Sequence, residues 1–234
     1  MKNNLLSIIV PVYNEEKTLK KIIDKVQKVN LNPIKKEIII VNDYSSDNTK
    51  EVILELKNNY SNIKLIEHKK NLGKGAAIRT GLKNISGDYI TIQDGDLEYN
   101  PNDFKKLLNP ILKGKTEVVY GSRLMGNVKG FNIPSHYYGN KLLSLLTGIL
   151  YGKKITDMET CYKLFTKKAI SKIELKSNKF DIEPEITSKF LKNKEKILEL
   201  PIDYNCRSFE EGKKITWKDG IIAIYTILKY RFSN

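Results

Sequence analysis

The amino-acid sequence predicts an α/β protein with a mainly parallel central sheet flanked by helices. Short apolar runs rich in β-branched residues alternate with segments whose apolar residues recur at helical spacing. This alternation is typical of right-handed βαβ units, which build parallel sheets. With 40% hydrophobic residues among 234, the chain has ample apolar material for such a core.

The first strand and the first helix are expected close together. Residues Leu5–Val12 form an apolar run that predicts a central strand. Asn14 is a favourable helix N-cap, and Glu15 and Glu16 suit the first helical turn. The apolar residues that follow repeat at helical spacing, and they are Leu19, Ile22, Ile23, Val26 and Val29.

Two further strand–helix pairs are expected next. Residues 37–41 predict a strand, and a turn at 42–47 leads into a helix that carries Val52, Ile53 and Leu56. Another strand is expected at Ile63–Glu67, and a helix that opens at Gly73-Lys74-Gly75 and runs through Leu82. This glycine pair is either a plain turn or a close approach to a phosphate or sugar. Neither a Walker A loop nor a GxGxxG dinucleotide motif is present.

Three acidic residues follow the next apolar run at alternate positions. The run Tyr89–Ile92 predicts a short buried strand, and Asp94, Asp96 and Glu98 come directly after it. Gly95 lets the backbone approach a ligand closely. Such a cluster repels itself unless a positive group is present, and hard oxygen ligands suit Mg²⁺ or Mn²⁺. Asp94, Asp96 and Glu98 are therefore the candidate metal ligands, with a solvated acidic loop as the alternative for this motif taken alone.

The polar residues at the strand ends are expected to line one crevice. Ligands of parallel α/β sheets bind outside the carboxyl ends of the strands. Three of those ends carry residues 13–15, Asp43, and residues 94–96. Packing alone does not explain an acidic residue at each of the three ends.

The pattern changes beyond Ser122. Residues 124–133 are expected to form a mobile loop of the kind that gates an acceptor. Residues 135–151 predict a helix that is apolar on most of its surface, for which burial is favoured over a lipid-facing position. Residues 196–204 predict a strand. The helix Trp217–Phe232 mixes apolar with basic residues, so it either packs on the sheet or lies in a membrane interface.

The charge of the chain restricts its partners only loosely. The formal net charge of +14 permits nucleic acid, anionic lipid or a polyanionic substrate. The excess is mostly lysine spread along the chain, so an AT-rich genome explains it as well as a binding face does. Because no nucleic-acid-binding motif is present, nucleic acid is not an expected partner.

The cysteines and the hydropathy predict a cytoplasmic protein. Cys161 and Cys206 fit neither a zinc motif nor a disulfide framework, so a reducing compartment is expected. The chain enters a strand almost at once, without room for a signal peptide. Because no apolar run reaches 18 residues, we expect no membrane span.

Five motifs, in order, resemble those of family 2 inverting glycosyltransferases with the GT-A fold. They are Pro11-Val12-Tyr13-Asn14-Glu15, residues 41–49, Asn71-Leu72-Gly73-Lys74-Gly75, Gln93-Asp94-Gly95-Asp96 and Gly121-Ser122-Arg123. Residues 157–163, 180–185 and 207–214 resemble bacterial members of the dolichyl- or polyprenyl-phosphate mannose and glucose synthase branch. Each motif is weak alone, but the ordered set is specific and covers nearly the whole chain.

The chain departs from the family pattern at three positions. Asn42 stands where the family often has the first Asp of an Asp-Asp pair, and the base-contacting Asp43 is kept. Gly95 replaces the middle residue of the usual Asp-Ala-Asp. Glu98 stands where the branch often has Gln, which adds charge to the metal site.

The resemblance implies a single domain over residues 1–234. Residues 1–123 would bind the nucleotide sugar, and residues 124–234 would form the acceptor side with C-terminal helices, the last of them amphipathic. The implied catalytic residues are Asp94, Asp96, Arg123 and Arg207. The implied donor-binding residues are Pro11, Tyr13, Glu15, Val41, Asp43, Lys74, Asp94, Gly95, Arg207 and Lys214, with Lys213 as a further point charge.

The implied activity is metal-dependent transfer of mannose or glucose from a GDP- or UDP-hexose to polyprenyl phosphate. That acceptor is already an anion and needs cationic groups, for which Arg123, Lys129 and His136 are candidates. A hydroxyl acceptor, as in cell-surface polysaccharide synthesis, would instead need a base such as Asp157 or Glu159. A non-catalytic nucleotide-sugar-binding protein is a third possibility, which the intact acidic set disfavours. The expected location is the cytoplasm, in peripheral contact with the cytoplasmic face of a membrane.

Overall fold

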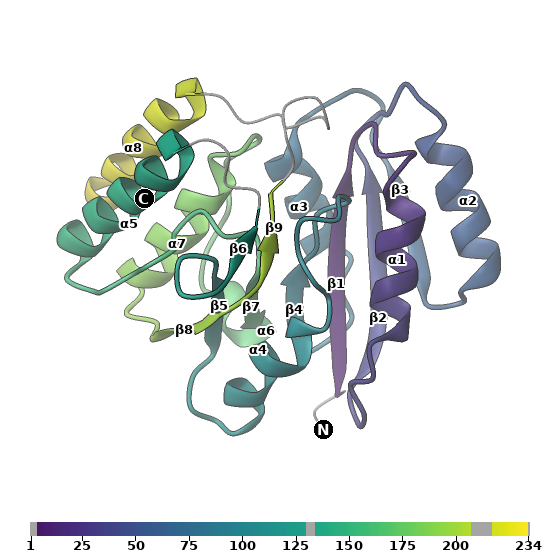
Figure 1. The fold of residues 1–234 in the computed structure, drawn as a ribbon, viewed down its shortest axis with the longest axis horizontal. Coiled ribbons are helices and arrows are strands. Elements are labelled where there is room, and N and C mark those ends of the chain that lie inside the picture. Colours follow the sequence, from purple (N-terminus) through teal and green to yellow (C-terminus); the bar gives the residue numbers. More distant parts are fainter. Residues whose placement is uncertain (1–3, 130–133, 207–216, 234) are drawn as a thin grey trace.

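The central feature of the fold is a seven-stranded sheet (Figure 1). The computed structural model describes residues 4–129, 134–206 and 217–233, with side chains except at 129, 134–136 and 217. The strand order is β3-β2-β1-β4-β7-β5-β8, and only the pairings of β7 with its two neighbours are antiparallel. These strands are β1 (Leu5–Val12), β2 (Lys35–Asn42), β3 (Ile63–Glu67), β4 (Tyr89–Ile92), β5 (Val118–Ser122), β7 (Lys163–Thr166) and β8 (Ile197–Pro201). The predicted α/β class and mainly parallel sheet are confirmed.

Helices connect and cover the strands. Helix α3 packs on β1 and β2, and α4 packs on β5 and β7, whereas α5, α7 and α8 pack on one another beside β8 (Figure 1). The helices are α1 (Leu19–Lys28), α2 (Thr49–Asn59), α3 (Lys74–Leu82), α4 (Asp103–Leu112), α5 (Pro134–Tyr151), α6 (Lys167–Ile170), α7 (Ile182–Lys192) and α8 (Trp217–Phe232). A small parallel sheet of β6 (Val128–Lys129) and β9 (Tyr204–Asn205) lies apart from the main sheet.

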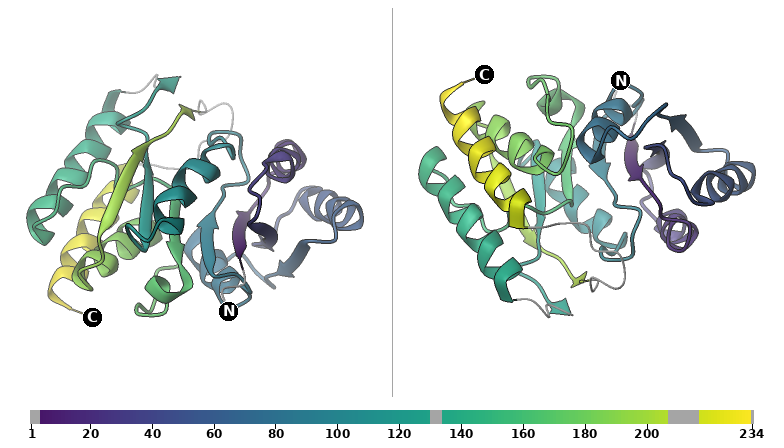
Figure 2. Two further views of the ribbon diagram at one scale, coloured as in Figure 1. Left: turned by 90° about the horizontal axis from the view of Figure 1, so that it is seen from below. Right: turned by 90° about the horizontal axis from the view of Figure 1, so that it is seen from above.

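The main core lies on both faces of the sheet. Strand β4 and most of β1 are buried, as are residues 38–42 of β2, as expected for parallel strands that are covered on both faces. A second cluster joins α5, α7 and α8, and its members are Leu143, Ile155, Met158, Leu191, Ala223 and Ile227. Figure 2 shows α5 and α8 side by side along one flank of the molecule.

Two local predictions need correction. Helix α1 begins at Leu19 after the N-cap Thr18, so Asn14 is not its cap. Asn14 has a φ of 55° and joins two loops instead, because its amide N–H donates to Ser45 Oγ and its Oδ1 accepts from the Ser46 amide. Strand β7 was not predicted. It pairs antiparallel with two neighbours and begins within the motif at residues 157–163.

The predicted burial of the helix at 135–151 is also wrong in part. Helix α5 buries Asn140, Ser144 and Thr147, while Leu142 and Ile149 are 61% and 70% exposed. The strand predicted at 196–204 is divided between β8 and β9, and the C-terminal helix is present. Part of the expected loop at 124–133 falls on residues 130–133, outside the described ranges.

Candidate active site

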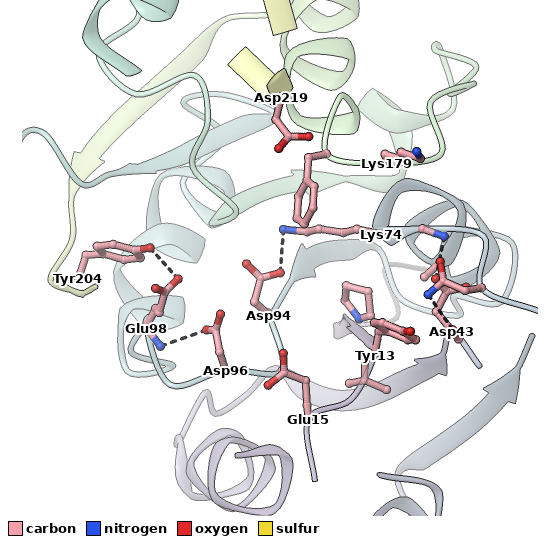
Figure 3. A pocket seen from close by; sticks show the side chains of 17 residues that line it. Tyr13, Glu15, Asp43, Lys74, Asp94, Asp96, Glu98, Lys179, Tyr204 and Asp219 are labelled. Atoms are coloured by element: carbon pink, nitrogen blue, oxygen red, sulfur yellow. Dashed lines mark hydrogen bonds and ion pairs between the residues drawn. The ribbon is translucent and has the colours of Figure 1, made fainter. Parts of the chain in front are cut away.

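A pocket of about 380 Å³ lies at the carboxyl ends of β1, β2 and β4 (Figure 3). The structure brings together the three strand ends that the sequence analysis placed in one crevice. The lining residues are Pro11, Val12, Tyr13, Glu15, Asp43, Asn71, Gly73, Lys74, Ala77, Asp94, Gly95, Asp96, Glu98, Lys179, Phe180, Tyr204 and Asp219.

Most, but not all, of the expected donor-binding residues line this pocket. The side chain of Val41 is the exception, since it is buried in a cluster with Ile39 and Ala77. Arg207 and Lys214 lie outside the described residues, as does Lys213. Lys129 and His136 lie where side chains are not described, so their predicted roles stay predictions.

Asp43 anchors the loop that leads into α3. Its Oδ1 accepts from the Leu72 amide at 2.9 Å, and its Oδ2 accepts from the Gly73 amide at 2.7 Å. His68 Nδ1 lies 2.6 Å from the same Oδ1, and Asp43 is only 3% exposed. The Asp43 carboxylate is therefore bound by groups of its own chain. These hydrogen bonds hold the loop at Leu72 and Gly73 against the pocket.

The loop at the start of α3 requires glycine at two positions. Gly73 has a φ of 95°, a left-handed conformation that favours glycine. A Cβ on Gly73 would meet Asn178 O at 2.4 Å, and one on Gly75 would meet Ser177 O at 2.6 Å. The close approach that the glycine pair permits is thus to residues 177–178 of the same chain, and it fixes the backbone of Lys74.

Lys74 lies between two carboxylates in the pocket. Its Nζ is 2.8 Å from Asp94 Oδ1 and 3.4 Å from Glu183 Oε1. Burial lowers the pKa of Lys74, but nearby negative groups, led by Asp94, outweigh it and raise that pKa well above its ordinary value. Glu183 Oε2 in turn accepts from the buried Lys163 Nζ at 2.5 Å. Opposite charges therefore alternate along the row Asp94, Lys74, Glu183 and Lys163.

The three expected metal ligands do not form one cluster among the described residues, and their role as ligands stays a prediction. Glu98 is directed to Tyr204, whose hydroxyl donates to Glu98 Oε2 at 2.6 Å, and Asp96 Oδ1 accepts from the Glu98 amide (Figure 3). Within the described ranges, no three acidic, His or Cys side chains are grouped closely enough to hold a metal. Three adjacent carboxylates would repel one another, and the hydrogen bond to Tyr204 draws one of them aside.

Asp94 and Asp96 still fit a divalent cation that arrives with a diphosphate. Mg²⁺ is commonly bound through one or two carboxylates together with substrate phosphates and water. Both carboxylates border the pocket, and their oxygens are the hard ligands that Mg²⁺ and Mn²⁺ prefer. Gly95 between them approaches the β1 loop, because a Cβ there would meet Val12 Cγ1 at 3.1 Å and Glu15 Cγ at 3.3 Å.

Arg123 is held beside the pocket by Asp157. Its Nε and Nη2 donate to the two carboxylate oxygens of Asp157, each at 2.8 Å, and its guanidinium lies 5.1 Å from the ring centre of Tyr204. Asn140 Nδ2 donates to Asp157 Oδ1 at 2.7 Å. Burial raises the pKa of Asp157, but the Arg123 charge and these hydrogen bonds outweigh it and lower that pKa below its usual value. The side chain is 0% exposed, so Asp157 holds Arg123 in place, and its role as a base for a hydroxyl acceptor stays a prediction.

Glu159 differs from Asp157 in its surroundings. Burial raises the pKa of Glu159 to about 7, and Oε1 has no hydrogen-bond partner in the part of the chain that is described. A carboxyl group with a pKa near neutrality suits a general base. Glu159 does not line the pocket, so it remains the base candidate for a hydroxyl acceptor only.

The pocket residues that were not among the candidate site residues include four from the second half of the chain. Phe180 lies in one of the motifs that carry the family resemblance, and Tyr204 ends a predicted strand. Asp219 is the lone carboxylate of an otherwise apolar and basic helix, a signal that could have been used. Lys179 and Asp219 reach the pocket from segments more than 80 residues beyond the acidic motif, which only the tertiary fold can show.

Fold and site together define a nucleotide-sugar transferase of the GT-A class. A model of the family described as Glycosyl transferase family 2 matches residues 7–174. The chain therefore belongs to glycosyl transferase family 2 and is a glycosyltransferase.

Relatives from the dolichyl-phosphate branch confirm the predicted subgroup. The UDP-N-acetylglucosamine–dolichyl-phosphate N-acetylglucosaminyltransferase of Methanococcus voltae is 32% identical, over 100% of this chain and 99% of that protein. A dolichyl-phosphate β-glucosyltransferase of Trichomonas vaginalis is 34% identical, and the dolichol-phosphate mannosyltransferase of Pyrococcus furiosus is 31% identical. These two matches cover 86% and 89% of this chain but only 65% and 58% of those longer proteins.

Solved structures support the fold alone. Glucosyl-3-phosphoglycerate synthase of Mycobacterium tuberculosis, in complex with Mn²⁺ and UDP-glucose, superposes with a TM-score of 0.74 at 17% identity. The match covers 99% of this chain and 80% of that one. It confirms the predicted GT-A architecture.

Proposed function

We propose that this glycosyltransferase moves one sugar, with inversion, from a nucleotide diphosphate sugar to dolichyl or polyprenyl phosphate. The observation that carries the proposal is the pocket in which Lys74 faces Asp94 and Asp96 at the strand ends, an arrangement suited to a diphosphate and its cation. The relative that matches this chain along its whole length is named for a transfer of this kind. That relative uses UDP-N-acetylglucosamine, which widens the expected donors beyond mannose and glucose.

In this proposal residues 1–234 act as one catalytic unit, and the donor lies along the pocket. Pro11, Tyr13 and the Asp43-anchored loop flank the nucleoside, and Lys74 compensates the diphosphate charge. Asp94 and Asp96 would hold a Mg²⁺ or Mn²⁺ ion, which stabilises negative charge on the leaving diphosphate when it is bound. The leaving nucleotide diphosphate keeps the electron pair of the broken bond between anomeric carbon and oxygen.

The acceptor phosphate needs positioning more than proton removal. One of its oxygens attacks the anomeric carbon from the face opposite the diphosphate and forms the new bond. Arg123 is the best-placed cation for holding the acceptor phosphate. Asp157 holds one edge of its guanidinium, through Nε and Nη2, and Asn140 in turn holds the Asp157 carboxylate. The commitment of Asp157 to Arg123 favours an acceptor that requires no base, which is what a lipid phosphate provides.

A peripheral contact with an anionic membrane surface completes the proposal. Among the exposed apolar side chains of α5 and α8 are Leu142, Leu145, Ile149, Ile221, Tyr225 and Phe232. Exposed basic residues lie on the same two helices, and they are Lys141, Lys218, Lys229 and Arg231. Apolar side chains with flanking cations suit the boundary between lipid headgroups and acyl chains.

The mixed burial of α5 supports this contact. A helix that packed only on protein would bury all of its leucines, whereas α5 buries Leu143 together with Asn140, Ser144 and Thr147 and leaves Leu142 and Leu145 exposed. No helix within the described ranges is long and apolar enough to cross a bilayer. We therefore propose attachment by this two-helix face, at the cytoplasmic face of a membrane.

A second candidate function is transfer to a saccharide hydroxyl. The pKa of Glu159, raised to about 7, favours it, because a hydroxyl nucleophile must lose its proton in the transition state. The non-catalytic alternative has no comparable observation in its favour.

The test is a matrix of donors and acceptors. UDP- and GDP-linked glucose, mannose and N-acetylglucosamine are each incubated with polyprenyl phosphate or with a simple glycoside, with and without EDTA. We expect a lipid-linked sugar product from one donor class only with the lipid phosphate and only without EDTA. Product on the glycoside alone would replace the proposal by the hydroxyl-acceptor function, and full activity in EDTA would remove the metal from it.

A further inference from the structure

The Lys74 ammonium is paired with Asp94, one of the two residues proposed to hold the cation. Its Nζ is 2.8 Å from Asp94 Oδ1, a distance typical of a charge-assisted hydrogen bond. Both side chains are more than four-fifths buried, so water screens the pair weakly. Figure 3 shows the Lys74 side chain crossing the pocket to reach Asp94.

A second carboxylate lies within reach of the same ammonium. Glu183 Oε1 is 3.4 Å from Lys74 Nζ, and it accepts no well-formed hydrogen bond from the described residues. Glu183 Oε2 is held by Lys163, and both of those side chains are almost completely buried. Glu183 is therefore a fixed anion with one oxygen that can take the ammonium after a small movement.

Only the side chain of Lys74 can make that movement. The backbone around it is fixed, because the Ala76 amide donates to Asn178 O at 3.0 Å and residues 177–178 touch both glycines that flank Lys74. Rotation of the side chain can carry Nζ from Asp94 toward Glu183 or toward a phosphate. Such a rotation requires no movement of the loop backbone.

We propose that Lys74 is an internal counter-cation that excludes a divalent cation from Asp94 until a nucleotide diphosphate binds. A divalent cation and the ammonium repel each other at one carboxylate, and Asp94 and Asp96 alone supply few ligands. The diphosphate attracts the ammonium away from Asp94 and adds its own oxygens to the cation. Cation and nucleotide therefore bind together, and this inference rests on the donor site of the proposed function.

The experiment measures Mn²⁺ binding directly, without turnover. The loss of the free Mn²⁺ signal in electron paramagnetic resonance is titrated for the full chain, alone and with UDP or GDP. We expect weak binding to the wild-type protein alone and at least about tenfold tighter binding with the matching nucleotide. Lys74→Met keeps the length of the side chain without its charge, and should tighten Mn²⁺ binding in the absence of nucleotide by about tenfold.

Lys179→Met is the matched control, because Lys179 lines the same pocket but forms no ion pair with Asp94 among the described residues. It should leave Mn²⁺ binding to the protein alone unchanged. Lys74→Gln serves if Lys74→Met does not fold, as judged by its circular dichroism spectrum and melting curve.

The outcomes separate the two proposals. Equal Mn²⁺ affinity of wild type and the Lys74 variant without nucleotide would overturn the counter-cation, as would tight binding by the wild-type protein alone. If the wild-type protein binds neither nucleotide nor Mn²⁺ under any condition, the donor site itself is wrong. A wild-type protein that binds nucleotide but never Mn²⁺, together with a Lys74 variant that does bind Mn²⁺, would show Lys74 to be a permanent substitute for the metal and would overturn the exchange.

Discussion

The donor side of the sheet and the α5–α8 flank differ in how much of their apolar surface is buried. Strands β1, β2 and β4 bury their apolar runs, and polar residues follow at their carboxyl ends. On the flank, α5 buries Asn140 and Thr147 while Leu145 and Ile149 are 60% and 70% exposed. The apolar residues of the donor strands lie in the protein's own core, whereas several apolar residues of the flank, among them Leu145 and Ile149, are exposed to a partner.

This difference explains why the local sequence pattern predicts the strands of the donor side but not which face of a flank helix is buried. A buried parallel strand must be apolar along its whole length, so its sequence alone predicts it. The sequence pattern of an apolar helix is the same whether its leucines face protein or lipid. Which face is buried depends on α7 and α8, which lie far along the chain.

The largest expected effect falls on the donor side alone. Asp96→Asn keeps the oxygen that accepts from the Glu98 amide but removes a charge from the proposed cation site. Turnover should fall by about 10²–10³, the usual loss when one group that stabilises transition-state charge is removed. Steady-state kinetics measure this loss, and liposome binding should stay unchanged. Wild-type turnover in this variant would remove Asp96 from the cation site.

The next effect concerns the link between the two regions. Asp157→Ala leaves Arg123 buried without its bidentate partner, so the free energy of unfolding should fall by about 3 kcal/mol. Chemical denaturation measures the change. Asp157→Asn, which keeps the hydrogen bond to Asn140 possible, should lose less stability and should keep transfer to polyprenyl phosphate above the level of metal-free enzyme. A loss of more than about a thousandfold in Asp157→Asn, with the fold intact, would mean that Asp157 is a base.

The Asp43 anchor should have a smaller effect, confined to donor binding. Asp43→Asn retains one acceptor oxygen, and the amides of Leu72 and Gly73 can no longer both bond to a carboxylate. We expect the dissociation constant for the nucleotide diphosphate to rise by about tenfold or more, since a hydrogen bond to a charged group is worth about 1.5–3 kcal/mol. Calorimetry with the free nucleotide measures it. Unchanged affinity would mean that the loop keeps its position without the anchor.

The flank has its own prediction, with a matched control on the donor side. Ile149→Ser removes a 70% exposed apolar side chain, and binding to anionic liposomes should weaken by about tenfold. Leu54→Ser is the control, because Leu54 is 44% exposed but lies on α2, far from the flank in the fold. Co-sedimentation at low salt measures both, and high salt should release the wild-type protein because the attraction is screened. If both variants lost liposome binding equally, the flank would not differ from the donor side in membrane binding.

The sequence could predict which strand ends form the site better than it could predict the contacts within the site. The ends of β1, β2 and β4 are marked by turns and acidic residues, and the structure places Tyr13, Asp43 and Asp94 in one pocket as expected. The pairing of Lys74 with Asp94 and Glu183 was not predicted. It depends on a close approach between residues 73–75 and 177–178, and no local pattern encodes that approach.

The direction in which a side chain points could not be predicted from the sequence either. Glu98 has the expected spacing for a third metal ligand, but Tyr204, from β9, determines where its carboxylate points. Asp157 has the chemistry of a base, but Arg123 determines its protonation. In both cases the partner is at least 34 residues away in the chain. Residue type predicts which chemistry is available, and the tertiary partner decides which part of it is used.

The smallest expected effect tests Glu159 through the pH dependence of stability. The pKa of its carboxyl is about 7 in the folded protein and 4.5 for the ordinary group, so the folded state holds this proton more tightly than the unfolded state does. The stability associated with that proton is fully present below pH 4.5, is lost as the pH rises toward 7, and is absent above it. Glu159→Gln cannot ionise. It should therefore match the wild type near pH 4.5 and melt at a higher temperature near pH 8.

A full shift of the Glu159 pKa from 4.5 to about 7 would correspond to about 3 kcal/mol, but the side chain is only half-buried and solvent reduces the cost of its charge, so the gain at pH 8 should be about 1 kcal/mol. Thermal unfolding from pH 4.5 to 8 measures it, and Glu174→Gln, a change at an exposed carboxyl, is the control that should show no such trend. Parallel assays give the functional side of the same variant. Transfer to polyprenyl phosphate should persist in Glu159→Gln because a lipid phosphate needs no base. A loss of more than about a thousandfold would show that Glu159 removes a proton, and would move the acceptor from a lipid phosphate to a hydroxyl.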